Sequence, residues 1–166
     1  AISFLDCNPP RCLAGYVAMR SEADPAPVLA WAAGCGITTA APAIVDGALV
    51  FRRHAPGDRL VAGRFGTHEP PATAGAVMPD TWLVPLLAFD ERGGRLGYGA
   101  GHYDRAIARA VASGSRPRLV GFAFSLQHVD RLPLEPHDQP PDPVVNEQGG
   151  LAFDRRDQER ALAPNH

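Results

Sequence analysis

The sequence TWLVPLLAFDERGGRLGYGAGHYDRAIARAVA occupies residues 81–112 of this 166-residue chain. Its apolar run, residues 82–89, has the length of a strand that is buried on both faces. Residues 104–112 predict a helix, with Ile107 and Val111 on one face. Between these two elements lies a loop that is rich in glycine. The order strand, loop, helix is typical of a unit whose loop faces a ligand.

Five glycines in this loop, at positions 93, 94, 97, 99 and 101, allow the backbone to approach a ligand closely. A glycine-rich loop that leads into a helix presents backbone N–H groups to an anion. Arg95 adds a positive charge suited to phosphate, and Asp104 adds an oxygen ligand suited to Mg²⁺. Together these residues predict a nucleotide-phosphate loop. The glycine spacing by itself is more typical of a flexible turn.

The composition limits the classes of protein to which the chain can belong. Its length and its 45% hydrophobic content suit one domain with a true core. A formal net charge of −2 gives no electrostatic footprint for nucleic acid or for an anionic membrane. All 16 basic residues are arginine, so a Walker-A lysine, a Schiff-base lysine and a lysine nucleophile are excluded.

Three cysteines, at positions 7, 12 and 35, do not form the even set of a disulfide framework and lack zinc-ligand spacing. No run approaches the roughly 20 apolar residues of a membrane span, and no signal segment opens the sequence. We therefore expect a soluble protein of a reducing compartment, the cytoplasm.

The remaining chain predicts an α/β fold in which a mostly parallel sheet is flanked by helices. A first strand is followed by a helix that has Asp24 as its N-cap and Pro25 at its first position. The turn Asp46-Gly47 separates two further strands. Strands are expected at residues 11–19, 37–44, 48–53 and 118–124, and the helix at 25–33. Irregular structure is expected at 57–79, a proline-rich loop at 133–143, a closing strand at Val144 and Val145, and a solvated tail or final helix at 154–160.

The string RLGYGAGHYDR at residues 95–105, preceded by VPLLAFD at 84–90, resembles the signature of the 5-formyltetrahydrofolate cyclo-ligases. These enzymes are also called methenyltetrahydrofolate synthetases. Further segments are similar to the family in the expected order. They are YVAMRSE at 16–22, FGTHEPP at 65–71, Gln127 followed by LPLEPHD at 132–138, and VVNE at 144–147.

The resemblance implies one domain over residues 1–166 with the fold of the NagB/RpiA/CoA-transferase-like group. It implies an ATP- and Mg²⁺-dependent cyclisation of 5-formyltetrahydrofolate to 5,10-methenyltetrahydrofolate. The partners would be the folate and ATP, without nucleic acid or membrane, and the protein would be a monomer or a weak dimer. The site would lie at the carboxyl ends of the strands.

Site residues follow from the same resemblance, position by position. The cofactor-binding residues would be Arg95, Leu96, Gly97, Tyr98, Gly99, Ala100, Gly101, His102 and Tyr103. Of these, Arg95, His102 and Tyr103 would be catalytic. The substrate would contact Val17, Glu22, Phe65, Tyr98 and His102, and Mg²⁺ would be held by Asp104 and Asp138.

Each of these residues could instead have a purely structural role. Asp104 would then stabilise a helix dipole, Asp138 a turn, and Glu22 a helix cap. Arg95 would lie at the surface, and His102 would be a tolerated polar substitution at the edge of the loop. The aromatic side chains would serve packing alone; they are Phe65, Tyr16 and Tyr103.

The sequence also departs from the family. The position of His102 usually carries tyrosine, and Tyr98 and Ala100 stand where many relatives carry basic residues. Relatives usually begin with a helical segment whose lysine and arginine clamp the nucleotide, and that segment is expected to be missing or diverged before the first strand. Two alternative functions stay open. One is a non-catalytic folate- or nucleotide-binding relative, and the other is a sugar-phosphate isomerase on a similar scaffold, against which the match at 132–138 argues.

Overall fold

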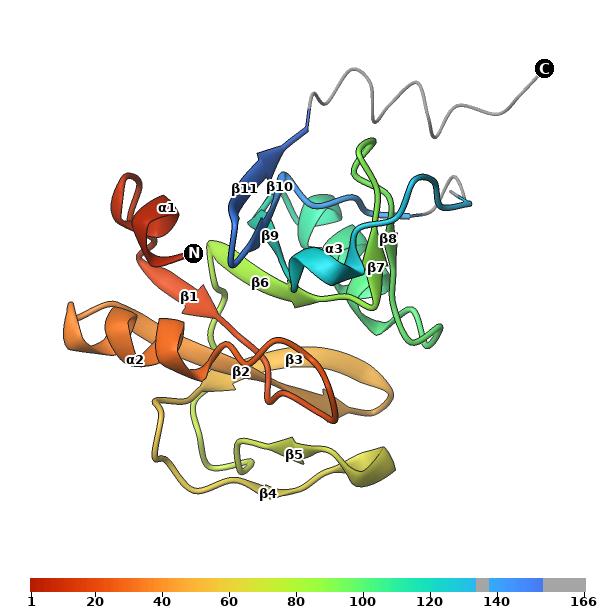
Figure 1. Cartoon of the computed structure of the whole chain (residues 1–166). Helices are drawn as coiled ribbons and strands as arrows, with labels where there is room; N and C mark the ends of the chain where they lie inside the picture. The colour runs from red at the N-terminus through yellow and green to blue at the C-terminus, as the bar shows by residue number, and fades with distance from the viewer. Residues whose placement is uncertain (134–137, 154–166) are drawn as a thin grey trace.

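The structure, a computed structural model, describes residues 1–133 and 138–153, apart from the side chain of Phe65. Within these residues the central sheet has the strand order β11 (Gly149–Ala152), β10 (Pro143–Asn146), β9 (Arg118–Phe122), β6 (Thr81–Pro85), β1 (Cys12–Ala14), β2 (Thr38–Val45) and β3 (Ala48–Arg53) (Figure 1). The inner pairs from β10 to β2 are parallel, and the outer pairs β10–β11 and β2–β3 are antiparallel. This confirms the predicted mostly parallel sheet.

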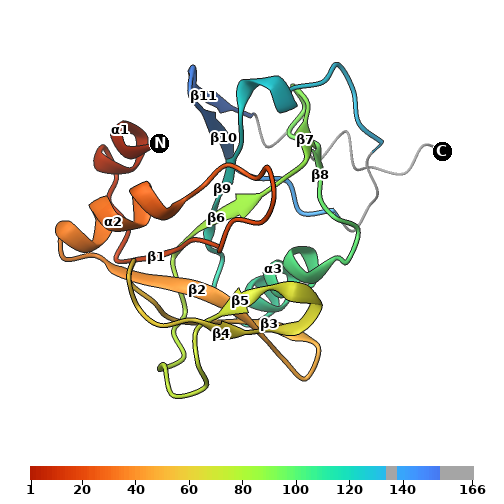
Figure 2. The ribbon, with the colours of Figure 1, turned by 60° about the horizontal axis from the view of Figure 1, so that its bottom comes forward.

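Helices cover both faces of the sheet (Figure 1, Figure 2). On one face, α1 (Ile2–Asp6) and α2 (Ala26–Gly34) bury Leu5 and Leu29 against Leu13 and Leu83 of β1 and β6. On the other face, α3 (His102–Ala112) packs against strand residues such as Trp82. Consecutive residues within β1, and within β6, thus pack into different cores on opposite faces of the sheet. Because both faces are buried, neither strand alternates between apolar and polar residues.

Helix α3 begins two residues before the predicted start and presents a different stripe to the core. Ala106, Ile107 and Ala110 are buried, whereas Val111 is 40% exposed. Ile107 and Val111 lie four residues apart in the helix, on one face as predicted, but only the part of that face around Ile107 is buried. The small side chains of Ala106 and Ala110 let the helix approach the sheet closely.

The apolar run 82–89 is not one strand. β6 ends at Pro85, and the chain then enters a separate hairpin of β7 (Ala88–Phe89) and β8 (Arg95–Leu96). Gln127 holds the two residues between β6 and β7, because its Nε2 donates to the carbonyl oxygens of Leu86 at 2.6 Å and Leu87 at 3.2 Å. The apolar run therefore changes its pairing partner without changing its composition.

Other elements also differ from the predicted ones. β1 is shorter than the predicted strand 11–19, and the chain leaves the sheet after Ala14. Pro25 is the N-cap of α2 rather than its first residue, and the Asp24 side chain accepts the N–H of Ala26 at 3.0 Å.

Asp46 and Gly47 form the predicted turn, with φ angles of 49° and 79°. The irregular segment 57–79 contains β4 (Val61–Ala62), η1 (Arg64–Gly66) and β5 (His68–Glu69). α1 and β11 were not predicted, and the predicted tail 154–160 lies outside the described residues.

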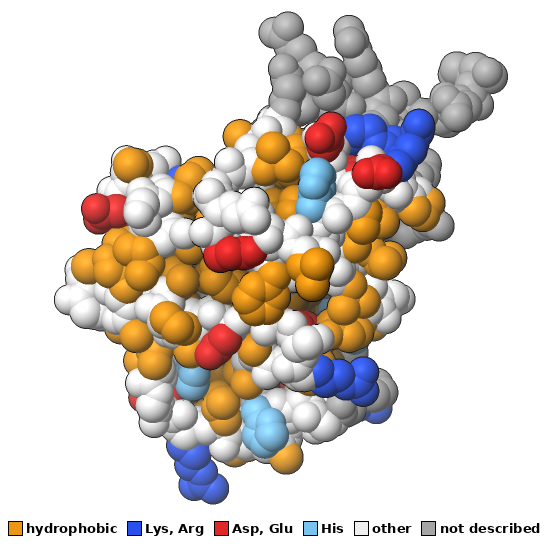
Figure 3. Space-filling view, viewed as in Figure 1, with side chains coloured by type: hydrophobic (Ala, Val, Ile, Leu, Met, Phe, Trp, Pro, Cys, Tyr) orange, Lys and Arg blue, Asp and Glu red, His pale blue; other side chains and the backbone are white. Residues whose placement is uncertain are grey.

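The outer surface mixes apolar and charged side chains. On the face in Figure 3, apolar side chains cover much of the surface and acidic side chains lie among them. No helix of the described residues is long and apolar enough to cross a membrane.

The carboxylate of Asp90 is fully buried and accepts four hydrogen bonds. They come from the Arg92 N–H at 3.0 Å, the Arg92 Nη2 at 2.8 Å, the Gly94 N–H at 2.8 Å and the Leu132 N–H at 2.9 Å. Burial alone would raise the pKa of Asp90, but these hydrogen bonds and the Arg92 charge hold it below its ordinary value. Asp90 thus ties the β7–β8 turn to the segment around Leu132.

Asp90→Asn is expected to lower the free energy of unfolding at pH 7 by about 3 kcal/mol, because buried donors lose a charged acceptor. Glu91→Gln, at the exposed neighbouring position, should change the free energy of unfolding little.

The stabilisation by Asp90 should depend on pH, because folding lowers the pKa of Asp90. This stabilisation is present above the unfolded-state pKa and is lost as the pH falls through the folded-state pKa. The difference between the Asn variant and the native protein should narrow below about pH 4 in urea unfolding curves. A constant difference down to pH 2 would contradict this role.

Candidate functional site

Residues 97–101 connect β8 to α3 and leave their backbone accessible. Tyr98, Gly99 and Ala100 are exposed. In the described part of the chain, the N–H groups of residues 97–100 donate to no other group. Gly99 has a φ of 82° and Gly101 a φ of 62°, so both adopt the left-handed conformation that favours glycine. The first N–H groups of α3 also lack partners within the helix, and Gly101 offers no capping side chain. This run of unused donors is suited to an anion.

Arg95 and Asp104 form an ion pair beside this loop, which the sequence did not predict. The Arg95 Nη2 donates to Asp104 Oδ1 at 2.5 Å, and the side chains are 7% and 23% exposed. The Gln139 N–H donates to the same oxygen at 3.2 Å, and the Arg95 Nε donates to the Gln139 carbonyl at 3.2 Å. Arg95 is therefore a largely buried side chain at the base of the loop, and a surface position for it is ruled out.

Asp138 directly precedes Gln139, so the backbone bond to Asp104 brings the two predicted metal ligands into one region. Among the described residues, no group of three His, Cys, Asp or Glu side chains has the geometry of a metal site. Mg²⁺ seldom uses such a protein cage, because it is usually held by one or two carboxylates, water and substrate phosphates. Asp104 and Asp138 next to an anion-accepting loop fit that arrangement.

Glu22 and Tyr98, far apart in sequence, lie close together at the loop. The Tyr98 hydroxyl interacts with the Glu22 carboxylate, which accepts the Met19 N–H at 2.8 Å. Partial burial raises the pKa of Glu22, and the Met19 hydrogen bond and the nearby Tyr98 hydroxyl oppose that shift. Glu22 is thus a half-buried acceptor held in place by its own turn, and it reaches the glycine-rich loop.

Two further tyrosines lie near Glu22. The Tyr103 hydroxyl is buried and has no hydrogen-bond partner among the described residues. Burial and then the Glu22 charge raise the pKa of Tyr103. The Tyr16 hydroxyl donates to the Ala23 carbonyl at 2.5 Å, and burial, followed by Glu22, raises the pKa of Tyr16. Both phenols therefore stay protonated, and the hydroxyl of Tyr103 has its donor unused.

His102, in the first turn of α3, contacts a residue that the sequence pattern did not single out. Its Nδ1 lies 3.3 Å from the Arg105 Nη2. Burial, and then the Arg105 charge, lower the pKa of His102. Arg105 belongs to the same glycine-rich string, but only the helical spacing of three residues would have pointed to this contact.

The remaining predicted residues are placed less tightly. Leu96 is 47% exposed in β8, and Val17 is half-buried in the segment that follows β1. The backbone of Phe65 lies in η1, but its side chain is outside the described residues. So are residues 134–137 of the predicted LPLEPHD segment.

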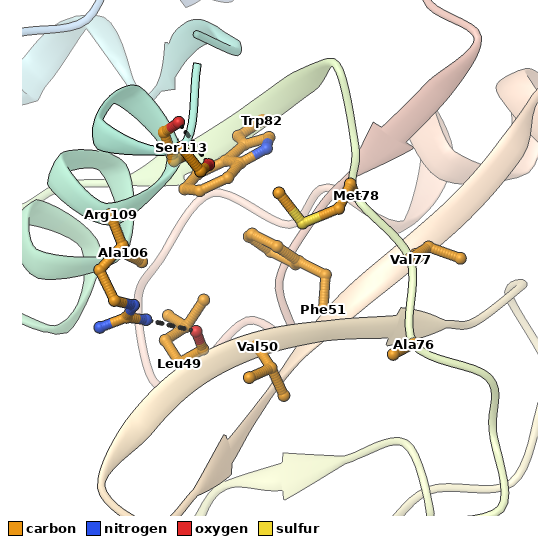
Figure 4. Close-up of a pocket in the computed structure, with 11 residues that line it drawn as sticks. Leu49, Val50, Phe51, Ala76, Val77, Met78, Trp82, Ala106, Arg109 and Ser113 are labelled. Carbon is orange, nitrogen blue, oxygen red and sulfur yellow. Dashed lines mark hydrogen bonds between the residues drawn. The ribbon is translucent and has the colours of Figure 1, made fainter. Parts of the chain in front are cut away.

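A separate apolar hollow of about 470 Å³ lies between α3 and β3 (Figure 4). Phe51 and Trp82 face into it, and Arg109 closes one side by donating to the Leu49 carbonyl at 2.9 Å. None of the predicted site residues lines this hollow. The hollow is therefore separate from the candidate site at the loop.

Comparisons with known proteins agree with the resemblance. A family model described as the 5-formyltetrahydrofolate cyclo-ligase family matches residues 9–147. The 5-formyltetrahydrofolate cyclo-ligase of Escherichia coli (strain K12) is 40% identical over 103 residues, which are 60% of this chain and 56% of that protein. The cyclo-ligase of Mycolicibacterium smegmatis is 37% identical over 109 residues, 62% of this chain and 53% of that protein. The matched region thus spans about half the length of these curated relatives.

A solved structure supports the same fold. The NMR structure of Aquifex aeolicus 5,10-methenyltetrahydrofolate synthetase superposes with a TM-score of 0.75 and 28% sequence identity. The superposition covers 99% of this chain and 82% of that chain.

The Tyr98–Glu22 contact can be tested by titration. Tyr98→Phe is expected to raise the pKa of Glu22 further, because it removes a hydroxyl that favours the charged carboxylate. Tyr103→Phe, which removes a nearby hydroxyl that makes no hydrogen bond with the described residues, should have the smaller effect. The measurement is a carbon-13 NMR titration of the Glu22 carboxyl group. An unchanged titration in Tyr98→Phe would show that the contact is not formed in solution.

Proposed function

Because the chain belongs to the 5-formyltetrahydrofolate cyclo-ligase family, we propose that it catalyses the ATP- and Mg²⁺-dependent cyclisation of 5-formyltetrahydrofolate to 5,10-methenyltetrahydrofolate. The observation that carries this proposal is the loop 97–101. Within the described residues its N–H groups make no hydrogen bond, the Arg95–Asp104 ion pair flanks it in sequence, and its Tyr98 interacts with Glu22. We further propose that the protein acts in the cytoplasm as a monomer or weak dimer.

The reaction explains why a phosphate site and a folate site must adjoin. A formamide carbon is a weak electrophile, and its oxygen is a poor leaving group. ATP supplies the phosphoryl group that turns this oxygen into a leaving group, and Mg²⁺ offsets the phosphate charge. The phosphoryl transfer leaves ADP, and the N10 amine then attacks the formyl carbon. A C–N bond forms, N10 loses its proton, and the C–O bond breaks with release of phosphate. The protein contributes positioning and charge compensation rather than a covalent nucleophile.

On the phosphate side, the N–H groups of residues 97–101 and the start of α3 would receive phosphate oxygens. Arg95, with Leu96 beside it, fixes a positive charge at the base of the loop. Asp104 and Asp138 would hold Mg²⁺, in part through water. Tyr103 would use its buried hydroxyl as a donor to a substrate oxygen.

On the folate side, Glu22 would accept N–H groups of the pterin, and Tyr98 would hold Glu22 in place and cover the ring. Val17 and Phe65 would supply apolar contacts. His102 is the first residue of α3, at the end of the loop and next to Tyr103, and it would lie where the two substrates meet. It would contact the formyl or phosphate oxygen.

The first test is a turnover assay with 5-formyltetrahydrofolate, ATP and Mg²⁺, followed by methenyl absorbance. Asp104→Ala is expected to lower kcat/KM at least about 100-fold, because it removes a metal ligand and leaves Arg95 without its carboxylate. Glu91→Ala, which removes an exposed carboxylate outside the loop, should turn over normally. Folded native protein that binds the folate without product would replace this proposal with a non-catalytic binding role.

A second test addresses the phosphate loop through a matched pair of glycines. Gly99 and Gly114 have φ angles of 82° and 81°, and an added methyl group would meet no atom within 4 Å at either position. Alanine at each should therefore lower stability by a similar amount, about 1–2 kcal/mol. Gly99→Ala is expected to raise the KM for ATP about tenfold by turning the loop N–H groups away, whereas Gly114→Ala, just beyond the end of α3, should not. Equal KM values for the two variants would remove the loop from the ATP site.

A further inference from the structure

The contact between His102 and Arg105 determines which ring nitrogen of His102 can carry a proton. The Arg105 Nη2 lies 3.3 Å from His102 Nδ1. A guanidinium group has donors and no acceptor, so Nδ1 must be the unprotonated, accepting nitrogen. The proton of the neutral ring then resides on Nε2. The contact therefore sets the ring as a donor through its other nitrogen.

The position of Arg105 needs an explanation, since a cation near the N-terminus of a helix opposes the helix dipole. No ion pair of the described residues involves Arg105. A side chain at position 101 would place its Cβ 2.9 Å from the Arg105 Nη1. The guanidinium group thus lies across Gly101 and against His102, at the side of the loop where the substrates would meet.

We propose that Arg105 is a positioning residue that holds His102 with its Nε2–H directed to donate to a substrate oxygen. This inference rests on the proposed function, in which that oxygen belongs to the formyl or the phosphoryl group. Because Nδ1 is occupied by Arg105, His102 does not use this nitrogen as a general base. His102 contributes a fixed hydrogen bond, and Arg105 acts on the reaction through His102.

The competing role for Arg105 is direct binding of a phosphate. A double-mutant cycle separates the two, because a residue that acts through His102 has no effect once His102 is gone. The four proteins are the native chain, Arg105→Met, His102→Phe and the double variant. Methionine keeps helix propensity, and phenylalanine keeps a ring without nitrogen.

Arg105→Met is expected to lower kcat about five- to tenfold when His102 is present and less than twofold in the His102→Phe background. The KM for ATP should stay within about twofold throughout. Arg109→Met, one turn further along α3, should leave kcat unchanged, because Arg109 binds the Leu49 carbonyl away from the loop. Thermal unfolding should show no loss of stability in Arg105→Met, since a cation is removed from the start of a helix.

Two kinetic results would overturn the proposal. An equal loss of kcat from Arg105→Met in both backgrounds would show that Arg105 does not act through His102. A KM for ATP that rises equally in both backgrounds would assign Arg105 to direct phosphate binding.

Nitrogen-15 NMR of the His102 ring tests the contact without any turnover. The native protein should show a protonated Nε2 and an unprotonated Nδ1, and the Arg105→Met variant should show an increased population of the Nδ1–H tautomer. Tautomer populations that are the same in both proteins, or a protonated Nδ1 in the native chain, would reject the positioning role. If the native chain makes no methenyl product, the proposed function fails, while this spectrum still decides whether Arg105 orients His102.

Discussion

The buried carboxylate of Asp90 is the constraint on which the site depends. A fully buried charge is tolerated only when it is paired and hydrogen-bonded, and Asp90 meets this condition with donors from Arg92, Gly94 and Leu132. The first two donors close the turn between β7 and β8, and the third holds the backbone at Leu132 against that turn. One carboxylate therefore positions the hairpin whose second strand carries Arg95.

Local sequence patterns predict much of the fold. The predictions that differ from the structure do so for one shared reason. The turn Asp46-Gly47 and strand 48–53 were correct, because positive φ and strand composition are local properties. The run 82–89 was wrong as a single strand, since an apolar sequence records burial but not the partner strand. Helix α3 illustrates a similar limit, because Ile107 is buried whereas Val111 on the same face is 40% exposed. Helical periodicity marks a face, and only tertiary packing decides how far the core extends around it.

In the candidate site, too, local patterns predict some features and leave out those that depend on tertiary packing. The glycine-rich loop and its flanking Arg95 and Asp104 were identified from consecutive residues. Their ion pair was not, because each side chain was assigned to a separate ligand, and sequence spacing does not show which charges meet. The approach of Glu22 to Tyr98 depends on the path of the chain after β1, and no local pattern records it. The sequence pattern does not indicate the contact of Arg105 with His102, three residues away, because this contact depends on the side-chain direction in the first turn of α3.

The Arg95–Asp104 pair gives a physical reason why the proposed site would bind the metal–nucleotide complex as a unit. Both side chains are largely buried and compensate each other in the structure. Breaking a buried pair by giving only one member a new partner leaves the other charge uncompensated, which costs about 3–5 kcal/mol. A phosphate without metal would pair with Arg95 and leave the Asp104 carboxylate uncompensated beside an anion. A metal ion without phosphate would pair with Asp104 and leave the Arg95 guanidinium uncompensated beside a cation. Only phosphate and Mg²⁺ together let both residues exchange one opposite charge for another. The ion pair thus keeps each charge compensated in the structure, and under the proposed function it would favour the one ligand combination that replaces both halves of the pair.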